Sequence, residues 1–97
     1  MSDPLPRLTA AELDPATLDA LFADLEACTE VDQVLIKGGA GRNADAVATL
    51  AVARAALAAG ARGVQIRYRW RDGWWFDTLM RTPTGVRLVR MPVPEAT

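Results

Sequence analysis

The chain has 97 residues, 51% of them hydrophobic and 24% charged, which is the size and composition of one small globular domain. It contains no histidine and one cysteine, which excludes a histidine general base, a Cys–His or Ser–His nucleophilic pair and an intramolecular disulfide. The net charge of −1 is unevenly distributed: residues 1–59 hold four cationic and nine acidic side chains, whereas residues 60–97 hold seven arginines and three acids.

Two explanations account for this charge distribution. In the first, the acids occupy the outer faces of helices while the arginines occupy one face of a sheet. In the second, an arginine-rich sheet face meets an anionic partner. The sequence does not decide between them.

The first residues, 1–6, contain neither a cationic region nor a hydrophobic stretch, so we expect no signal peptide. No apolar run approaches the roughly 20 residues that cross a bilayer, so we expect no membrane partner. Arginine outnumbers lysine ten to one and alanine is abundant, which suggests a GC-rich bacterial genome. Together with the single free thiol, these features predict a cytoplasmic bacterial protein.

The ends of the chain are predicted to differ from its middle. Residues 1–8 are rich in proline and are expected to be flexible, as is the tail at 93–97, whereas 9–92 should form a single α/β domain. Thr9 and Glu12 have the spacing of a capping box, which predicts one helical turn there.

A helix is predicted over 15–28. Asp14 is a favourable N-cap, and Pro15 suits the first helical position. The apolar side chains that follow have helical spacing and form one stripe: Leu18, Leu21, Phe22, Leu25 and Cys28. Because Cys28 closes this stripe, we expect it to be a buried structural thiol.

A strand and a second helix are predicted next. Residues 31–37 are rich in β-branched side chains, which favours a strand. A helix is expected over 45–59, ended by Gly60. Thr49 is an alternative N-cap, and a start there would leave 38–48 irregular. A strand, a helix and a further strand in succession form a βαβ unit, so we expect parallel strands with a right-handed crossover.

The connection after this strand is rich in glycine and carries two cations. Free backbone amides beside cationic side chains can form a weak anion-binding site, here Lys37, Gly38, Gly39 and Arg42. The glycine spacing matches neither the dinucleotide-binding pattern nor a P-loop. A flexible connection is therefore the preferred interpretation.

Three further strands are predicted at 64–71, 74–81 and 86–91, since the first of them alternates apolar and cationic residues with period two. Asp72-Gly73 predicts a two-residue type I′ hairpin turn, and 82–85 a second turn. The order α-β-α-β-β-β predicts an α+β fold. We expect a four-stranded mixed sheet in the order 1-2-3-4, with both helices on one face and a C-terminal antiparallel meander.

One face of the predicted meander is aliphatic and should receive the helices. The predicted register places Asp77 opposite both Tyr68 and Arg90 on this face. A carboxylate there needs a partner, so we expect a salt bridge from Arg90 and a hydrogen bond from Tyr68. In the second interpretation these three residues are weak catalytic candidates, with Asp77 as a general base in a small cleft near Trp70 and Trp75.

The opposite face of the meander is both basic and apolar. Trp, Phe, Met and Arg are enriched at protein interfaces. We predict a binding surface made of Arg67, Arg69, Arg71, Trp74, Phe76, Met80, Arg87, Val89 and Met91. The same arginines could instead stack on neighbouring rings, or bind nucleic acid together with them, although an acidic pI argues against a dedicated nucleic-acid binder.

From these patterns we expect a small non-catalytic accessory protein that binds a protein partner, or itself, through the basic and aromatic face. The alternative is a binder of an anionic ligand or of single-stranded nucleic acid through the sheet arginines. The third hypothesis is a small enzyme that uses Asp77, Tyr68 and Arg90. We expect no cofactor and no metal.

Overall fold

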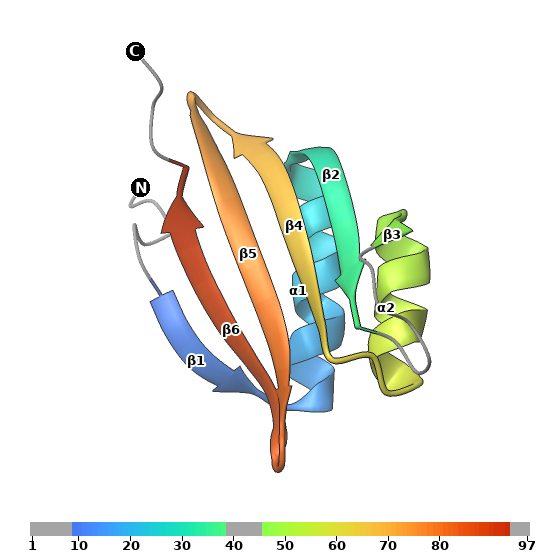
Figure 1. Cartoon of the computed structure of the whole chain (residues 1–97). Coiled ribbons are helices and arrows are strands. Elements are labelled where there is room, and N and C mark those ends of the chain that lie inside the picture. Colours follow the sequence, from blue (N-terminus) through green and yellow to red (C-terminus); the bar gives the residue numbers. More distant parts are fainter. Residues whose placement is uncertain (1–8, 39–45, 94–97) are drawn as a thin grey trace.

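Figure 1 shows the computed structural model, which describes residues 9–38 and 46–93. An antiparallel sheet of six strands in the order β1-β6-β5-β4-β2-β3 carries two helices on one face. The elements in chain order are β1 (Thr9–Leu13), α1 (Pro15–Cys28), β2 (Glu30–Lys37), β3 (Ala46–Val47), α2 (Leu50–Ala58), β4 (Gly63–Trp70), β5 (Gly73–Thr82) and β6 (Gly85–Pro92). The predicted four-stranded mixed sheet in the order 1-2-3-4 is therefore wrong.

Strands β2 and β4, which correspond to the two strands of the predicted βαβ unit, run antiparallel and not parallel as predicted. Lys37 at the end of β2 pairs with Gly63 at the start of β4. The cause is β3, which runs back along β2 with Leu35 opposite Val47 before α2 returns the chain. The connection between β2 and β4 therefore runs along the sheet twice, once in β3 and once in α2. The helix of a βαβ crossover runs along it only once, which leaves the two strands parallel.

The segment predicted as a helical turn is the edge strand β1. It pairs with β6, with Ala10 opposite Val89 and Glu12 opposite Arg87. Without β1, the backbone groups along this side of β6 would have no ladder partner, and this pairing outweighs the local capping-box signal.

Helix α1 has the predicted bounds. The Asp14 side chain accepts a hydrogen bond from the Thr17 amide at 2.7 Å, and Pro15 occupies the first turn. The predicted burial of Cys28 is wrong, because its side chain is exposed. At 100° per residue Cys28 lies about 80° from Leu18, at the margin of the stripe, whereas the buried Phe22 and Leu25 lie on either side of Leu18 and closer to it.

Helix α2 begins at the later of the two predicted starts. The Thr49 hydroxyl accepts a hydrogen bond from the Val52 amide at 3.2 Å. Residues 46–47 form β3, and the rest of the segment predicted as either helix or loop, 39–45, lies outside the described residues. At the other end of α2, Arg81 Nη2 donates to the Leu57 carbonyl, so a cation lies at the negative end of the helix dipole.

The turn of the β4–β5 hairpin lies one residue earlier than predicted, which shifts every cross-strand partner by two residues. Trp70 pairs with Gly73, so the two-residue turn is Arg71-Asp72 rather than Asp72-Gly73. Arg71 has a φ of 58°, and among the described residues it is the one non-glycine residue with positive φ. Only the first turn residue has positive φ, which excludes the predicted type I′ turn and resembles type II′.

This register shift leaves the predicted faces intact. A shift of two residues returns each side chain to the same side of the sheet, whereas a shift of one would reverse it. The second turn is as predicted, with Thr82 paired with Gly85 and Asp77 opposite Arg90.

The hydrophobic core lies between the helices and one face of the sheet. Alternate residues of the central strands are completely buried there, including Val64, Ile66 and Leu79. Ala53 and Leu57 of α2 complete the layer together with Phe22 and Leu25 of α1. The small side chain of Ala53 lets α2 approach the sheet closely.

The described residues also extend just past β6. The Val93 amide donates to the Trp74 carbonyl at 2.9 Å, which continues the pairing with β5. The segments predicted to be flexible, 1–8 and most of the tail, lie outside the described residues. Neither helix in the described part of the chain is long and apolar enough to cross a membrane.

Candidate interaction surface

On the helix-covered face, Tyr68, Asp77 and Arg90 form one buried cluster, as the sequence predicts. Arg90 donates two parallel hydrogen bonds to the Asp77 carboxylate, from Nε at 2.8 Å and from Nη2 at 2.7 Å. The Tyr68 hydroxyl donates to the same carboxylate at 2.9 Å. Asp77 contacts Tyr68 diagonally, because the residue directly opposite Asp77 is Ile66.

Burial governs the chemistry of this cluster. Asp77 and Tyr68 are 0% exposed, and Arg90 is 8% exposed. Burial, followed by the charge of Asp77, raises the pKa of the Tyr68 hydroxyl well above its ordinary value, so Tyr68 stays protonated and donates. Both carboxylate oxygens are occupied by Arg90. A role for Asp77 as a general base would require this cluster to open.

The predicted cleft beside the cluster exists as a hollow of about 500 Å³. Trp70 and Cys28 are among its lining residues, and Arg90 reaches it. Trp75 lies opposite Tyr68 and packs at the margin of the core instead of lining the hollow. Tyr68 is also among the lining residues, so two members of the buried cluster, Tyr68 and Arg90, border the hollow.

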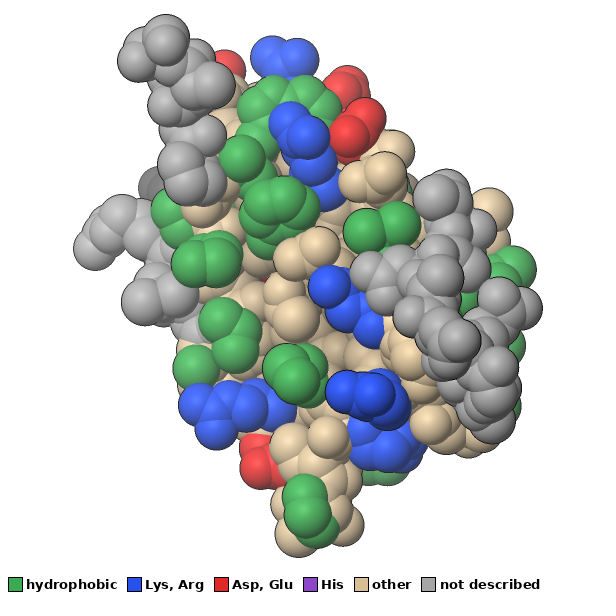
Figure 2. Space-filling model, in the orientation of Figure 1, with side chains coloured by type: hydrophobic (Ala, Val, Ile, Leu, Met, Phe, Trp, Pro, Cys, Tyr) green, Lys and Arg blue, Asp and Glu red, His purple; other side chains and the backbone are tan. Residues whose placement is uncertain are grey.

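Neither helix of the described residues lies over the other face of the sheet, and Figure 2 shows this face with apolar and cationic side chains intermingled. Strand register places alternate residues of five strands on it. They are Ala10 and Glu12 of β1, Arg87, Val89 and Met91 of β6, Trp74, Phe76, Thr78, Met80 and Thr82 of β5, Gln65, Arg67 and Arg69 of β4, and Glu30, Gln33, Leu35 and Lys37 of β2. Asp32, at the irregularity of β2 between Val31 and Gln33, adds its carboxylate beside Arg67. We call this set, with Asp32, the uncovered face.

Trp74, Phe76, Met80, Val89 and Met91 of β5 and β6 form an apolar patch on the uncovered face. Trp74, Phe76 and Val89 are half-buried among their neighbours on β5 and β6. Met80 is 54% exposed and Met91 45% exposed, and these are two of the three large apolar side chains that the described residues leave exposed. Eight of the nine residues predicted as a binding surface lie on this face.

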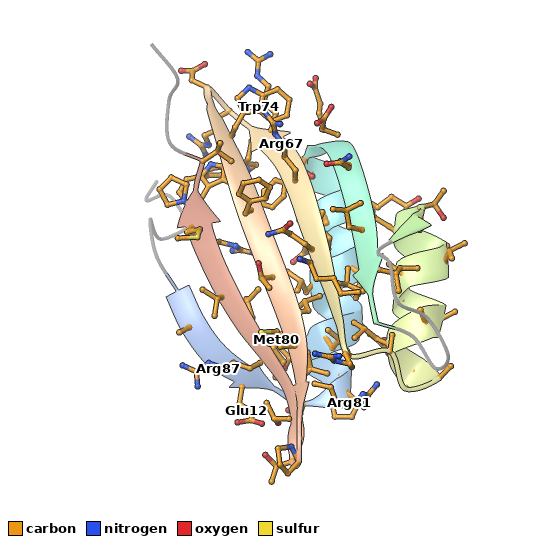
Figure 3. All side chains as sticks on the ribbon, in the orientation of Figure 1. Glu12, Arg67, Trp74, Met80, Arg81 and Arg87 are labelled. Carbon is orange, nitrogen blue, oxygen red and sulfur yellow. The ribbon has the colours of Figure 1, made fainter. Side chains whose placement is uncertain are left out.

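The ninth, Arg71, does not. It lies in the β4–β5 turn, where its guanidinium carbon is 4.5 Å from the centroid of the Trp70 ring. Arg67 also stacks locally, 5.0 Å from the centroid of the Trp74 ring, and Figure 3 shows the two side chains together. Local cation–π stacking therefore occurs at two of the arginines.

Each arginine of the uncovered face has a carboxylate beside it. Arg67 Nε lies 3.8 Å from Asp32 Oδ2, which is an ion pair but too long for a hydrogen bond. Arg69 stands opposite Glu30 across the β2–β4 pair. Glu12 similarly stands opposite Arg87 across the β1–β6 pair.

These acids do not fit the interpretation in which the acids occupy the outer faces of helices. Glu30 and Asp32 belong to β2, and Glu12 belongs to β1. Glu30 directly precedes the predicted strand 31–37, so its position in the sequence already indicated that it could lie on the sheet. No local signal pointed to Glu12, because β1 was read as a helical turn.

Glu12 also fixes the edge of this face. Its Oε2 accepts hydrogen bonds from the hydroxyls of Thr82 at 2.6 Å and Thr84 at 2.8 Å. These two bonds, with a smaller contribution from Arg87, hold the pKa of Glu12 below its ordinary value. Glu12 thereby links β1 to the β5–β6 turn, and Figure 3 shows it beside Arg87.

The predicted anion site is only partly described. Lys37 ends β2, and Gly38 follows with a φ of 57°. A Cβ atom at Gly38 would lie 3.0 Å from Arg62 Cδ. Gly39 and Arg42 lie outside the described residues.

The fold and this face define a small α+β protein with an antiparallel sheet that is covered by helices on one side. The chain matches no known protein family, and no curated protein or solved structure has significant similarity to it. Within residues 9–38 and 46–93, no three Cys, Asp or Glu side chains gather as metal ligands would.

Proposed function

We propose that the protein is a non-catalytic binding module whose uncovered face docks on a protein partner. The observation that carries this proposal is the composition of the face: exposed Met80 and Met91 share it with Trp74 and Phe76, and each of its arginines stands near or opposite a carboxylate. Protein interfaces have this composition, an apolar and aromatic centre inside a polar rim.

The carboxylates that stand near these arginines favour a protein over a nucleic acid as the partner. A sheet that binds single-stranded nucleic acid offers unpaired cations to the phosphates and open rings to the bases. Here Asp32, Glu30 and Glu12 each stand beside an arginine, and Arg67 covers the Trp74 ring.

Burial argues against the enzyme hypothesis. A catalytic residue must touch the substrate, but Asp77 and Tyr68 have no exposed surface. The bidentate bond from Arg90 satisfies the carboxylate in the way of a structural ion pair. The cluster therefore serves to join β4, β5 and β6.

The test uses a photo-crosslinking amino acid placed at Met80 or, as a matched control, at Val52 on α2. Both positions are 54% exposed, but only Met80 lies on the uncovered face. In the cells that produce the protein, we expect irradiation to give a discrete protein adduct from position 80 and none from position 52. The adduct should disappear when Met91→Glu places a charge in the patch. Equal labelling from both positions would refute the proposal.

A further inference from the structure

We infer that the occupant of the uncovered face is a second copy of this chain, in a face-to-face dimer with two-fold symmetry. This inference rests on the proposed function, because it names the partner of the same face. Three features of the face support it: charge, size and the arrangement of its centre.

The charge of the face suits an identical partner. Its described cations are Lys37, Arg67, Arg69 and Arg87, and its carboxylates are Glu12, Glu30 and Asp32. A strongly basic face would repel its own copy and select an acidic protein. This face has four cations and three carboxylates, and each of its arginines has a carboxylate beside it. It therefore neither repels its own copy nor selects an acidic protein.

The size of the face is sufficient for a stable dimer. The molecule measures 42 × 30 × 21 Å, and the sheet presents one of its broad sides. A standard interface buries roughly 800 Å² on each partner, which is less than the area of this side. An isologous dimer needs only this one patch, used twice.

The centre of the patch suits sheet-on-sheet packing. Two sheets stack about 10 Å apart when side chains from both fill the space between them. Trp74, Phe76, Met80, Val89 and Met91 provide such side chains from two neighbouring strands. The unbranched methionines adapt to an irregular gap, so a twisted sheet can pack on its copy without empty space.

Symmetry identifies the residue nearest the axis. In a face-to-face dimer, the two-fold axis relates the patch of one copy to the patch of the other, and it passes near the middle of the patch. Thr78 lies there, between Phe76 and Met80 along β5, and between Gln65 of β4 and Val89 of β6. Thr78 of one copy therefore lies close to Thr78 of the other.

The first experiment measures mass in solution by sedimentation equilibrium over a wide range of protein concentrations. Wild type should have twice the 10.4 kDa mass of the chain. Met80→Glu should raise the dissociation constant of the dimer about 100-fold or more, because it removes an apolar side chain from both copies and places a charge in the interface twice. Val52→Glu, at the equally exposed control position, should leave the dimer unchanged.

Circular dichroism checks that the variants fold. Met91→Glu provides a second disruption if Met80→Glu does not fold, since Met91 is also exposed at the patch. A wild-type chain that stays monomeric at all concentrations overturns the second copy as the partner. A dimer that both substitutions leave intact overturns this face as its interface.

The second experiment locates the symmetry axis. In a Cys28→Ser background, a short bismaleimide should join two chains that carry Thr78→Cys and should not join chains that carry Val52→Cys. Equal yields at the two positions would contradict the face-to-face arrangement.

The photo-crosslinking experiment separates the two proposals. An adduct of twice the chain mass supports both of them. An adduct of a different mass, with a monomeric purified chain, keeps the face as a docking surface but removes the second copy. Lack of any adduct specific to position 80 removes the docking surface itself.

Discussion

The two faces of the sheet are built from alternate residues of the same strands, yet they satisfy their charges in different ways. Under the helices, Asp77 and Arg90 form a bidentate pair that is almost completely buried. On the uncovered face, Arg67 and Asp32 approach only to 3.8 Å, and both side chains remain substantially exposed. The covered face uses its charges to join strands, whereas the uncovered face holds its charges at the edge of an apolar patch.

The largest expected effect tests this difference directly. Asp77→Ala should destabilise the protein by about 3–5 kcal/mol, because it leaves the Arg90 charge buried without a partner. Asp32→Ala removes the exposed pair and should cost less than about 1 kcal/mol. Urea denaturation of the two variants measures both values. Similar losses would mean that the two ion pairs are not as different as their burial suggests.

Leu79 and Met80 are neighbours on β5 that point to opposite faces. Leu79→Ala should cost about 2–5 kcal/mol, because Leu79 is 0% exposed and its truncation leaves a cavity in the core. Met80→Ala should stay within about 0.5 kcal/mol when the protein is dilute, as expected for a surface position. Urea midpoints at low protein concentration provide the comparison. A large effect of Met80→Ala in the dilute protein would show that Met80 belongs to the intramolecular core.

Position 63 belongs by register to the uncovered face, but the neighbouring backbone leaves no room for a side chain at Gly63. A Cβ atom there would lie 2.8 Å from the Leu79 carbonyl oxygen, so Gly63→Ala should force a backbone shift that costs about 1–3 kcal/mol. Gly73→Ala is the control, because its Cβ would lie 3.4 Å from Trp75 Nε1 and Gly73 does not have positive φ. Thermal melts of both variants measure the contrast. An equal shift in melting temperature would contradict the close backbone approach at Gly63.

The smallest effect concerns the rim of the uncovered face. The pKa of Glu12 is depressed in the folded protein, so its contribution to stability is present above the unfolded value and is lost as the pH falls through the folded value. The difference in urea midpoint between wild type and Glu12→Gln should therefore be largest near neutral pH and shrink below about 4.5. The same difference at both pH values would show that the carboxylate charge is not what links β1 to the turn.

Some parts of this structure could be predicted because their signals are local. Asp14 and Pro15 define the start of α1 without any knowledge of the rest of the fold. The assignment of β5 residues to faces survived a wrong turn position, since an even register shift preserves the alternation of side chains. For the same reason Tyr68, Asp77 and Arg90 meet as expected.

Other parts depend on pairings that leave no local trace. Leu13 pairs with Val86, far along the chain, and nothing near Thr9 favours a strand over a helical turn. The direction of β4 depends on the two residues of β3. The residues of the candidate surface can therefore be predicted from the meander alone. Its charge balance cannot, because Glu12 joins the face only through the pairing of β1 with β6.

The pairing of the first described strand with the last has a consequence for how the chain folds during synthesis. Leu13 leaves the ribosome before its partner Val86, and ribosomes add residues at about 5–20 per second, so β1 waits roughly 4–15 s for β6. At the end of this interval, once β5 has emerged and before β6 follows, β5 also has an unpaired edge. An unpaired edge of this kind promotes pairing between nascent chains, so the early arrival of β6 beside β5 limits the time in which such pairing can occur.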